Sequence, residues 1–170
     1  MKKTILALST ALLTFVNVSA QSPVKEIKFG GRIMYDMAVW GDSTMGNAGT
    51  EFRRVRFYNS GKLYGNIKYK LQLDFTGGAI SFKDVWIELS KLPLNGNLRV
   101  GHFKEPLRLE SLTSSKYITF MERALPIAFA PERNTGAMYH TTFGEKISLQ
   151  TGIFREGDSF GNDKESTNNV

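Results

Sequence analysis

Residues 67–75 read Ile-Lys-Tyr-Lys-Leu-Gln-Leu-Asp-Phe, and this stretch decides the fold class. Apolar side chains occupy every second position from Ile67 to Phe75, and polar or charged side chains fill the positions between them. A period of two residues is the period of a β-strand, because successive side chains point to opposite faces of a sheet. The stretch therefore predicts a strand with one apolar face and one charged face.

The same alternation recurs on both sides of this stretch, at residues 27–39, 54–58, 84–89 and 147–153. Short connections rich in glycine and asparagine separate the runs, and such residues favour tight hairpin turns. They are Gly65-Asn66, Gly77-Gly78, Asn95-Gly96 and Gly144-Glu145. Together, runs and turns predict seven strands, at residues 26–40, 51–63, 66–76, 79–90, 97–104, 135–143 and 146–156.

Composition limits the class of protein. The chain has 170 residues, no cysteine and a formal net charge of +6. This length fits one domain, and the absence of cysteine excludes a disulfide framework, a thiolate metal site and a cysteine nucleophile. The positive charge by itself fits nucleic acid, anionic lipid or an anionic solute as partner.

The first twenty residues are typical of a cleaved secretory signal peptide. Lys2 and Lys3 form a basic start, an apolar run covers 4–18, and Val18-Ser19-Ala20 offers a small-residue cleavage site. The apolar run is short for a membrane-spanning helix. We therefore expect a signal peptide at 1–20 and a single exported β-domain at 21–170. Export argues against a nucleic-acid partner.

Alternating strands fit either a soluble β-sandwich or an outer-membrane β-barrel. Two observations favour the barrel. Charged residues occupy the middle of the polar faces, while the apolar faces are continuous and aromatic, as expected for a wet lumen and a lipid-facing wall. Several strands also reach about 10 residues, the length that crosses a bilayer at a tilt. Tight turns at one end and longer connections at the other, at residues 41–50 and 105–134, fit the same architecture.

Several motifs are similar to one known family. Gly31-Arg32-Ile33 is followed by Phe-Arg-Arg-Val-Arg at 52–56, and Lys83-Asp84-Val85-Trp86 comes later. The most specific block begins with Gly-His-Phe-Lys-Glu-Pro-Leu at 101–107 and continues to Arg133. These motifs resemble the phosphate-selective porin family, the porin O and P type, of bacterial outer membranes.

The resemblance implies a transmembrane barrel of sixteen antiparallel strands, a homotrimer in the bacterial outer membrane, and selection of anions, especially phosphate. It implies no cofactor. The seven predicted strands would be the N-terminal part of such a barrel. The tail at 158–170 does not alternate and has no terminal aromatic strand, so we expect the chain to be a fragment of a longer product.

Basic residues on the predicted lumen face are the first candidates for anion binding. An arginine fork holds two oxygens of a phosphate at once, whereas lysine acts as a mobile point charge. The strand candidates are Arg32, Arg54, Arg56, Lys68 and Lys70. Arg53 has the opposite parity and is expected to serve a subunit interface. Since Asp36, Asp74, Asp84 and Glu88 share the lumen faces, each base could instead belong to a neutral ion-paired wall.

The connection at about 105–134 supplies the other candidates. Its apolar content is too high for a solvated loop, so we expect it to fold inward, pack on the lumen wall and narrow the pore. This would hold Lys104, Arg108, Lys116, Arg123 and Arg133 near the constriction. Four glutamates in and beside the loop leave structural ion pairs as the alternative.

Enzymatic motifs are absent from the sequence. His102 and His140 lack metal-ligand spacing, and there is no nucleophile elbow or phosphate loop. We therefore expect no catalysis, no metal site and no cofactor, but passive diffusion of phosphate or polyphosphate through an Arg/Lys-lined channel. The alternative is a structural or non-anion-selective outer-membrane barrel on the same scaffold. A Ser/His/Asp site at the barrel rim is the remaining enzymatic alternative.

Overall fold

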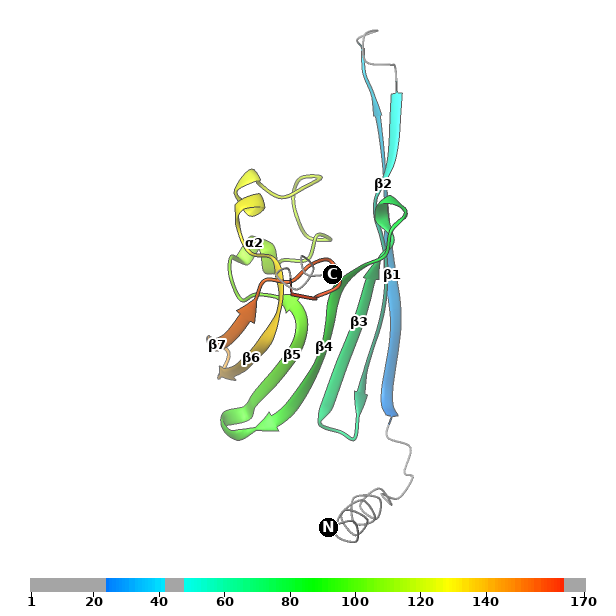
Figure 1. The fold of residues 1–170 in the computed structure, drawn as a ribbon. Coiled ribbons are helices and arrows are strands. Elements are labelled where there is room, and N and C mark those ends of the chain that lie inside the picture. The colour runs from blue at the N-terminus through cyan, green and yellow to red at the C-terminus, as the bar shows by residue number, and fades with distance from the viewer. Residues whose placement is uncertain (1–23, 42–47, 164–170) are drawn as a thin grey trace, which may run out of the picture.

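A computed structural model gives the structure of the protein and describes residues 24–41 and 48–163. The predicted signal peptide at 1–20 lies outside these residues. Seven antiparallel strands form one sheet in sequence order (Figure 1), which confirms the all-β prediction. The strands are β1 (Val24–Val39), β2 (Ala48–Leu63), β3 (Ile67–Asp74), β4 (Ser81–Leu92), β5 (Gly96–Lys104), β6 (Arg133–Phe143) and β7 (Ile147–Arg155).

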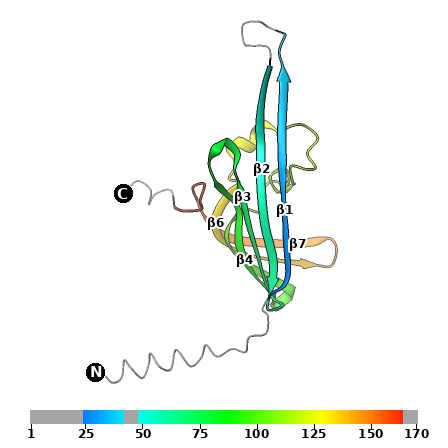
Figure 2. The ribbon, with the colours of Figure 1, turned by 90° about the vertical axis from the view of Figure 1, so that its right-hand side faces the viewer.

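Helical structure in the described residues is confined to short turns between strands. They are η1 (Thr76–Gly78), η2 (Pro93–Asn95), α2 (Leu109–Leu112) and η3 (Leu125–Phe129). Within the described ranges, none of these is a helix of the length and apolar character needed to span a membrane. β1 and β2 are the longest strands, with 16 residues each, and extend beyond the others (Figure 2).

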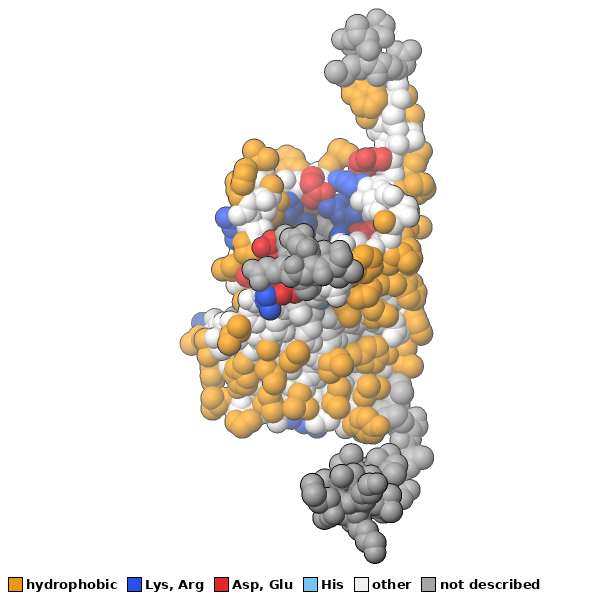
Figure 3. Space-filling view, viewed as in Figure 1, with side chains coloured by type: hydrophobic (Ala, Val, Ile, Leu, Met, Phe, Trp, Pro, Cys, Tyr) orange, Lys and Arg blue, Asp and Glu red, His pale blue; other side chains and the backbone are white. Residues whose placement is uncertain are grey.

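The sheet has an apolar face and a charged face, as the alternation predicts. On β1 the side chains of Phe29, Ile33 and Tyr35 are exposed on one face, whereas Arg32 and Met34 are partly buried on the other. We call the first the outer face and the second the inner face. Figure 3 shows hydrophobic side chains over the lower part of the sheet and along β1 and β2, with charged side chains gathered higher up.

Register shifts interrupt the alternation at several places, and two of them are β-bulges that change which charged residues face inward. Met34 pairs with Arg54 but Tyr35 pairs with Phe52, so Arg53 is an extra residue on β2. A bulge lets two consecutive residues face the same side of a sheet. Arg53 Nε lies 2.9 Å from the inner-face carboxylate of Asp36. The prediction that Arg53 has the opposite parity from Arg54 is therefore wrong.

The second bulge lies on β4. Leu71 pairs with Val85 and Leu73 with Phe82, which leaves Lys83 and Asp84 opposite a single residue of β3. Lys83 Nζ lies 3.9 Å from Asp74 Oδ2, and Lys70 Nζ donates to Asp84 Oδ2 at 2.7 Å. Both bulges thus add one charged side chain to the inner face.

Gly101 on β5 occupies a position that no other residue fits. Its φ is +139°, and a Cβ there would lie 2.3 Å from the Val85 carbonyl oxygen and 2.7 Å from the Trp86 Cα. We expect Gly101→Ala to lower the free energy of unfolding by about 2–4 kcal/mol, because it combines backbone strain with a clash against backbone atoms.

Denaturant unfolding of the purified protein, followed by circular dichroism, measures this change. Gly41→Ala is the matched control, since a Cβ at Gly41 meets nothing within 4 Å. We expect the control to stay within about 0.5 kcal/mol of the parent. Equal stability of the two variants would contradict the close approach at Gly101.

Candidate functional site

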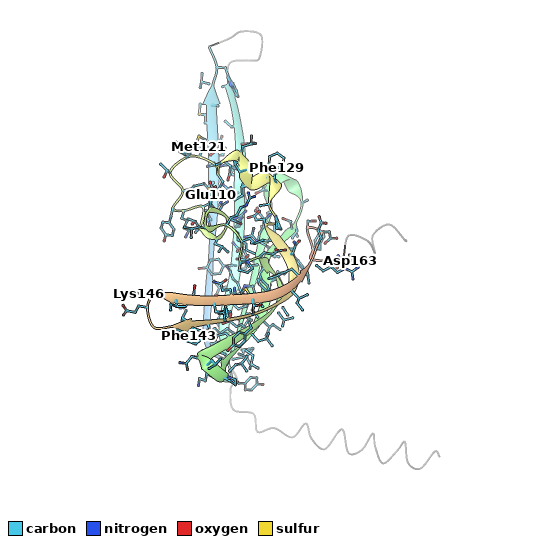
Figure 4. All side chains as sticks on the ribbon, turned by 90° about the vertical axis from the view of Figure 1, so that its left-hand side faces the viewer. Glu110, Met121, Phe129, Phe143, Lys146 and Asp163 are labelled. Carbon is cyan, nitrogen blue, oxygen red and sulfur yellow. The ribbon has the colours of Figure 1, made fainter. Side chains whose placement is uncertain are left out.

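Residues 105–132 connect β5 to β6 and lie against the inner face of the sheet; we call them the cross-segment. Three arginines of β1 and β2 hold it there. Arg32 donates to Ser115 Oγ, Arg53 donates to the Met121 carbonyl, and Arg54 pairs with Glu122. Figure 4 shows the cross-segment, with Glu110, Met121 and Phe129 labelled, beside these two strands. Guanidinium groups therefore join the connection to the wall.

Arg123 braces the cross-segment from within. Its Nε donates to the Glu110 carbonyl at 2.9 Å and its Nη2 to the Thr113 carbonyl at 2.7 Å. The Glu110 carboxylate in turn accepts the backbone N–H of Ala124 at 2.8 Å. These bonds fix two distant parts of an otherwise irregular connection, so the position of the Arg123 guanidinium is set by its backbone partners.

The apolar side chains of the cross-segment do not behave as predicted. Leu109 is 82% exposed, Tyr117 80% and Phe129 81%. The expectation that the apolar side chains pack on the wall is wrong for these three exposed ones, and polar contacts attach this part of the cross-segment. An arginine can reach a backbone carbonyl across a gap that an apolar side chain would have to fill.

A cavity of about 1160 Å³ lies between the cross-segment and strands β1 to β6. Nine of the ten basic residues predicted from the sequence line it. They are Arg32, Arg54, Arg56, Lys68, Lys70, Lys104, Lys116, Arg123 and Arg133. The tenth, Arg108, is not among the lining residues; its guanidinium is exposed and donates to the Pro126 carbonyl.

Carboxylates neutralise most of these cations. Residues directly opposite each other in the sheet supply two pairs, Arg56 with Asp74 and Lys68 with Glu88. Further pairs join Lys70 and Arg133 to Asp84, at 2.7 and 2.9 Å, and Lys104 to Glu132 at 3.4 Å. For these residues the ion-paired wall describes the observed geometry.

Arg32 differs from them. Within the described ranges it has no carboxylate at ion-pair distance, its hydroxyl partner Ser115 is uncharged, and its buried Nε makes no hydrogen bond. Arg56, Arg54 and Arg123 act on it with like charge, and Asp74 acts with opposite charge. We call Arg32, Arg54, Arg56 and Arg123 the arginine cluster. This part of the cavity carries more cations than carboxylates.

The sequence prediction missed several inner-face cations: Arg53, Lys83 and Arg99, and also Lys28 and Lys62, which line the cavity. The first two lie at bulges. Arg99 could have been found from the alternation of its strand, since it lies between the apolar residues Leu98 and Val100. The register places it opposite Glu88. Arg99 donates to Glu88 Oε2 at 2.7 Å and stacks over the Trp86 ring at 4.2 Å.

Glu88 is the centre of a second charged group, apart from the arginine cluster. The residue is 2% exposed. It accepts from Lys68 Nζ at 3.1 Å and from Arg99, and its Oε2 lies 3.0 Å from His140 Nε2. These three bonded partners are themselves inner-face side chains, so this group stabilises the wall.

Comparison with known proteins agrees with this geometry. The chain matches the model of the family described as "Phosphate-selective porin O and P" over residues 27–170. It is 27% identical over 139 residues to Porin O of Pseudomonas aeruginosa, covering 74% of this chain and 32% of the relative. The chain thus spans about a third of the length of that curated relative. No solved structure gives a significant match. By this match the chain belongs to the phosphate-selective porin O and P family.

Proposed function

We propose that the protein is a channel of the bacterial outer membrane through which phosphate or polyphosphate diffuses passively. The observation that carries this proposal is the arginine cluster, which faces the cavity with Arg32 unpaired by any carboxylate of the described residues. An anion that enters a narrow pore loses water, and it needs positive charge and hydrogen-bond donors in return. Guanidinium groups supply both, in a geometry that suits oxyanions.

The ion-paired lysines and arginines would also attract a permeating anion, but more weakly than the arginine cluster. Along the wall from Lys68 and Lys70 to Arg133, each cation has a carboxylate within 4 Å, with Asp84 shared by Lys70 and Arg133. Such pairs attract an anion weakly. A strong site flanked by weak ones lets an ion bind and still leave, which conduction requires. We propose that the cluster is the strong site and that Lys116, also without a carboxylate at ion-pair distance among the described residues, lies on the approach to it.

The outer face supports a membrane location. Its exposed side chains include Phe29, Ile33, Met37, Leu98 and Ile153. Apolar residues that alternate with inward polar ones are typical of a lipid-facing barrel wall. The homotrimer implied by the resemblance stays a prediction, and chemical crosslinking of the purified protein tests it.

A channel without anion selectivity is the second candidate, favoured by the extent of ion pairing. The test is the reversal potential of the full-length protein in a planar bilayer under a potassium chloride gradient, followed by added phosphate. We expect an anion-selective reversal and a chloride current that millimolar phosphate blocks. A cation-selective or unselective reversal that is indifferent to phosphate would favour the second candidate.

A further inference from the structure

Glu122 places a carboxylate of the cross-segment inside the arginine cluster. Its Oε2 pairs with Arg54 Nη2 and lies 4.0 Å from Arg53 Nη1. Its Oε1 lies 3.9 Å from Arg123 Nη1 and accepts the Arg123 backbone N–H at 3.2 Å. Three guanidinium groups therefore lie within 4.0 Å of one carboxylate, with Arg54 as hydrogen-bond donor and the other two at ion-pair distance.

The Glu122 carboxylate is both charged and displaceable. Partial burial works against ionisation, but the bonds from Arg54 and from the Arg123 amide outweigh it and hold the pKa of Glu122 below its ordinary value. The side chain is nevertheless 50% exposed, unlike the 10% of its Arg54 partner. A half-exposed group can swing into water at little cost, whereas the buried arginine stays in place.

We propose that Glu122 is an internal competitor for the anion site, a tethered carboxylate that the permeating oxyanion displaces on entry and that returns as the anion leaves. This rests on the proposed function of the cluster as an anion site. A tethered group has a high effective concentration at its site, so the apparent affinity for any external anion falls by the fraction of time that the site is free. The same group speeds release, because the arginines are never left without a counter-charge.

Glu132 provides the matched control. It lines the same cavity and its side chain is 46% exposed. Its partners are Lys104 at 3.4 Å and Arg133 at 2.9 Å, outside the arginine cluster. Replacing it by glutamine removes one negative charge from the cavity and leaves the cluster occupied by Glu122. The two variants thus separate competition at the site from a general change in cavity charge.

The experiment compares the full-length protein, Glu122→Gln and Glu132→Gln in planar bilayers, with inorganic phosphate as the probe. Two quantities are measured: the phosphate concentration that half-blocks the chloride current, and the saturating current carried by phosphate alone. The contacts of Arg32 with Ser115 and of Arg53 with the Met121 carbonyl do not involve the Glu122 side chain, so the cross-segment stays attached in Glu122→Gln. Circular dichroism checks that the strand content is unchanged.

For Glu122→Gln we expect the half-blocking concentration to fall about tenfold, the factor for a site that Glu122 occupies about nine-tenths of the time. We also expect a lower saturating phosphate current, because exit becomes slower. Glu132→Gln should change both by less than about threefold. If Glu122→Gln matches Glu132→Gln, or weakens phosphate binding, the competitor role is overturned and Glu122 only anchors the cross-segment. A parent protein without anion selectivity would instead overturn the proposed function itself.

Discussion

Replacing Arg32 by alanine should raise the phosphate concentration that half-blocks the chloride current by about tenfold to a hundredfold. A hydrogen bond to a charged group contributes about 1.5–3 kcal/mol, and each 1.4 kcal/mol is a factor of about ten in affinity. Arg32 is the member of the arginine cluster whose charge no described carboxylate neutralises, so its loss removes net attraction. The measurement is the phosphate titration of the current in a planar bilayer.

Two control variants separate the loss of the Arg32 charge from the loss of its contact with the cross-segment. Ser115→Ala removes the uncharged partner of Arg32 and loosens the cross-segment without removing a cation. Lys28→Ala removes a cation that also lines the cavity but is paired with Glu26 at 2.7 Å. We expect both to shift the half-blocking concentration by less than about threefold. A Lys28→Ala effect as large as that of Arg32→Ala would mean that the cavity acts only through its total charge.

Replacing Glu88 by alanine should destabilise the sheet by about 3–5 kcal/mol, because it leaves Lys68 and Arg99 on the inner face without their carboxylate. Glu88 is almost fully buried and is bonded to three side chains from three other strands, Lys68, Arg99 and His140. Denaturant unfolding in detergent, followed by circular dichroism or tryptophan fluorescence, gives the change in free energy.

Glu26→Ala is the control for this second variant. Glu26 also pairs with a lysine, since its Oε1 lies 2.7 Å from Lys28 Nζ on the same strand, but both side chains are more than half exposed. An exposed ion pair contributes little, so we expect a change within about 1 kcal/mol. Equal effects of the two substitutions would show that burial at Glu88 does not strengthen its ion pairs. The chloride conductance of Glu88→Ala should keep its phosphate block, since the arginine cluster is separate.

The strands could be predicted from the sequence because burial on one face imposes a period of two. The run at 67–75 has no competing helical pattern, and the observed strand ends at Asp74, one residue before the apolar run does. The turns were equally predictable: Gly65 and Gly144 adopt the positive φ that glycine tolerates, and Asn95 does so too.

Partners across the sheet could not be predicted in the same way. Alternation places Lys68, Glu88 and Arg99 on one face, but it does not fix the register that sets them directly opposite each other. A shift by two residues would keep every face and exchange every partner. The sequence could therefore name nine of the cations that line the cavity and still leave open that most of them are ion-paired.

The cross-segment was the least predictable part. Its leucines and phenylalanines suggested apolar packing, whereas backbone carbonyls and a glutamate make the contacts to Arg53 and Arg54. Hydrogen bonds to an irregular backbone leave no periodic signal in the sequence. Arg53 and Arg54 face the same side of the sheet only because of a bulge, and strict alternation predicts opposite sides for two consecutive residues.

The bulge at Arg53 has a genetic consequence. Phe52 still pairs with Tyr35 and Arg54 with Met34. The residues of β2 before and after Arg53 therefore already face the same sides of the sheet as their partners on β1. Deletion of the single codon for Arg53 would make the pairing of β1 with β2 continuous at this point, and it would not turn any other side chain from one face of the sheet to the other. A wall of this kind can therefore gain or lose one cation by a three-nucleotide insertion or deletion, a step that would invert every later position of a regular strand.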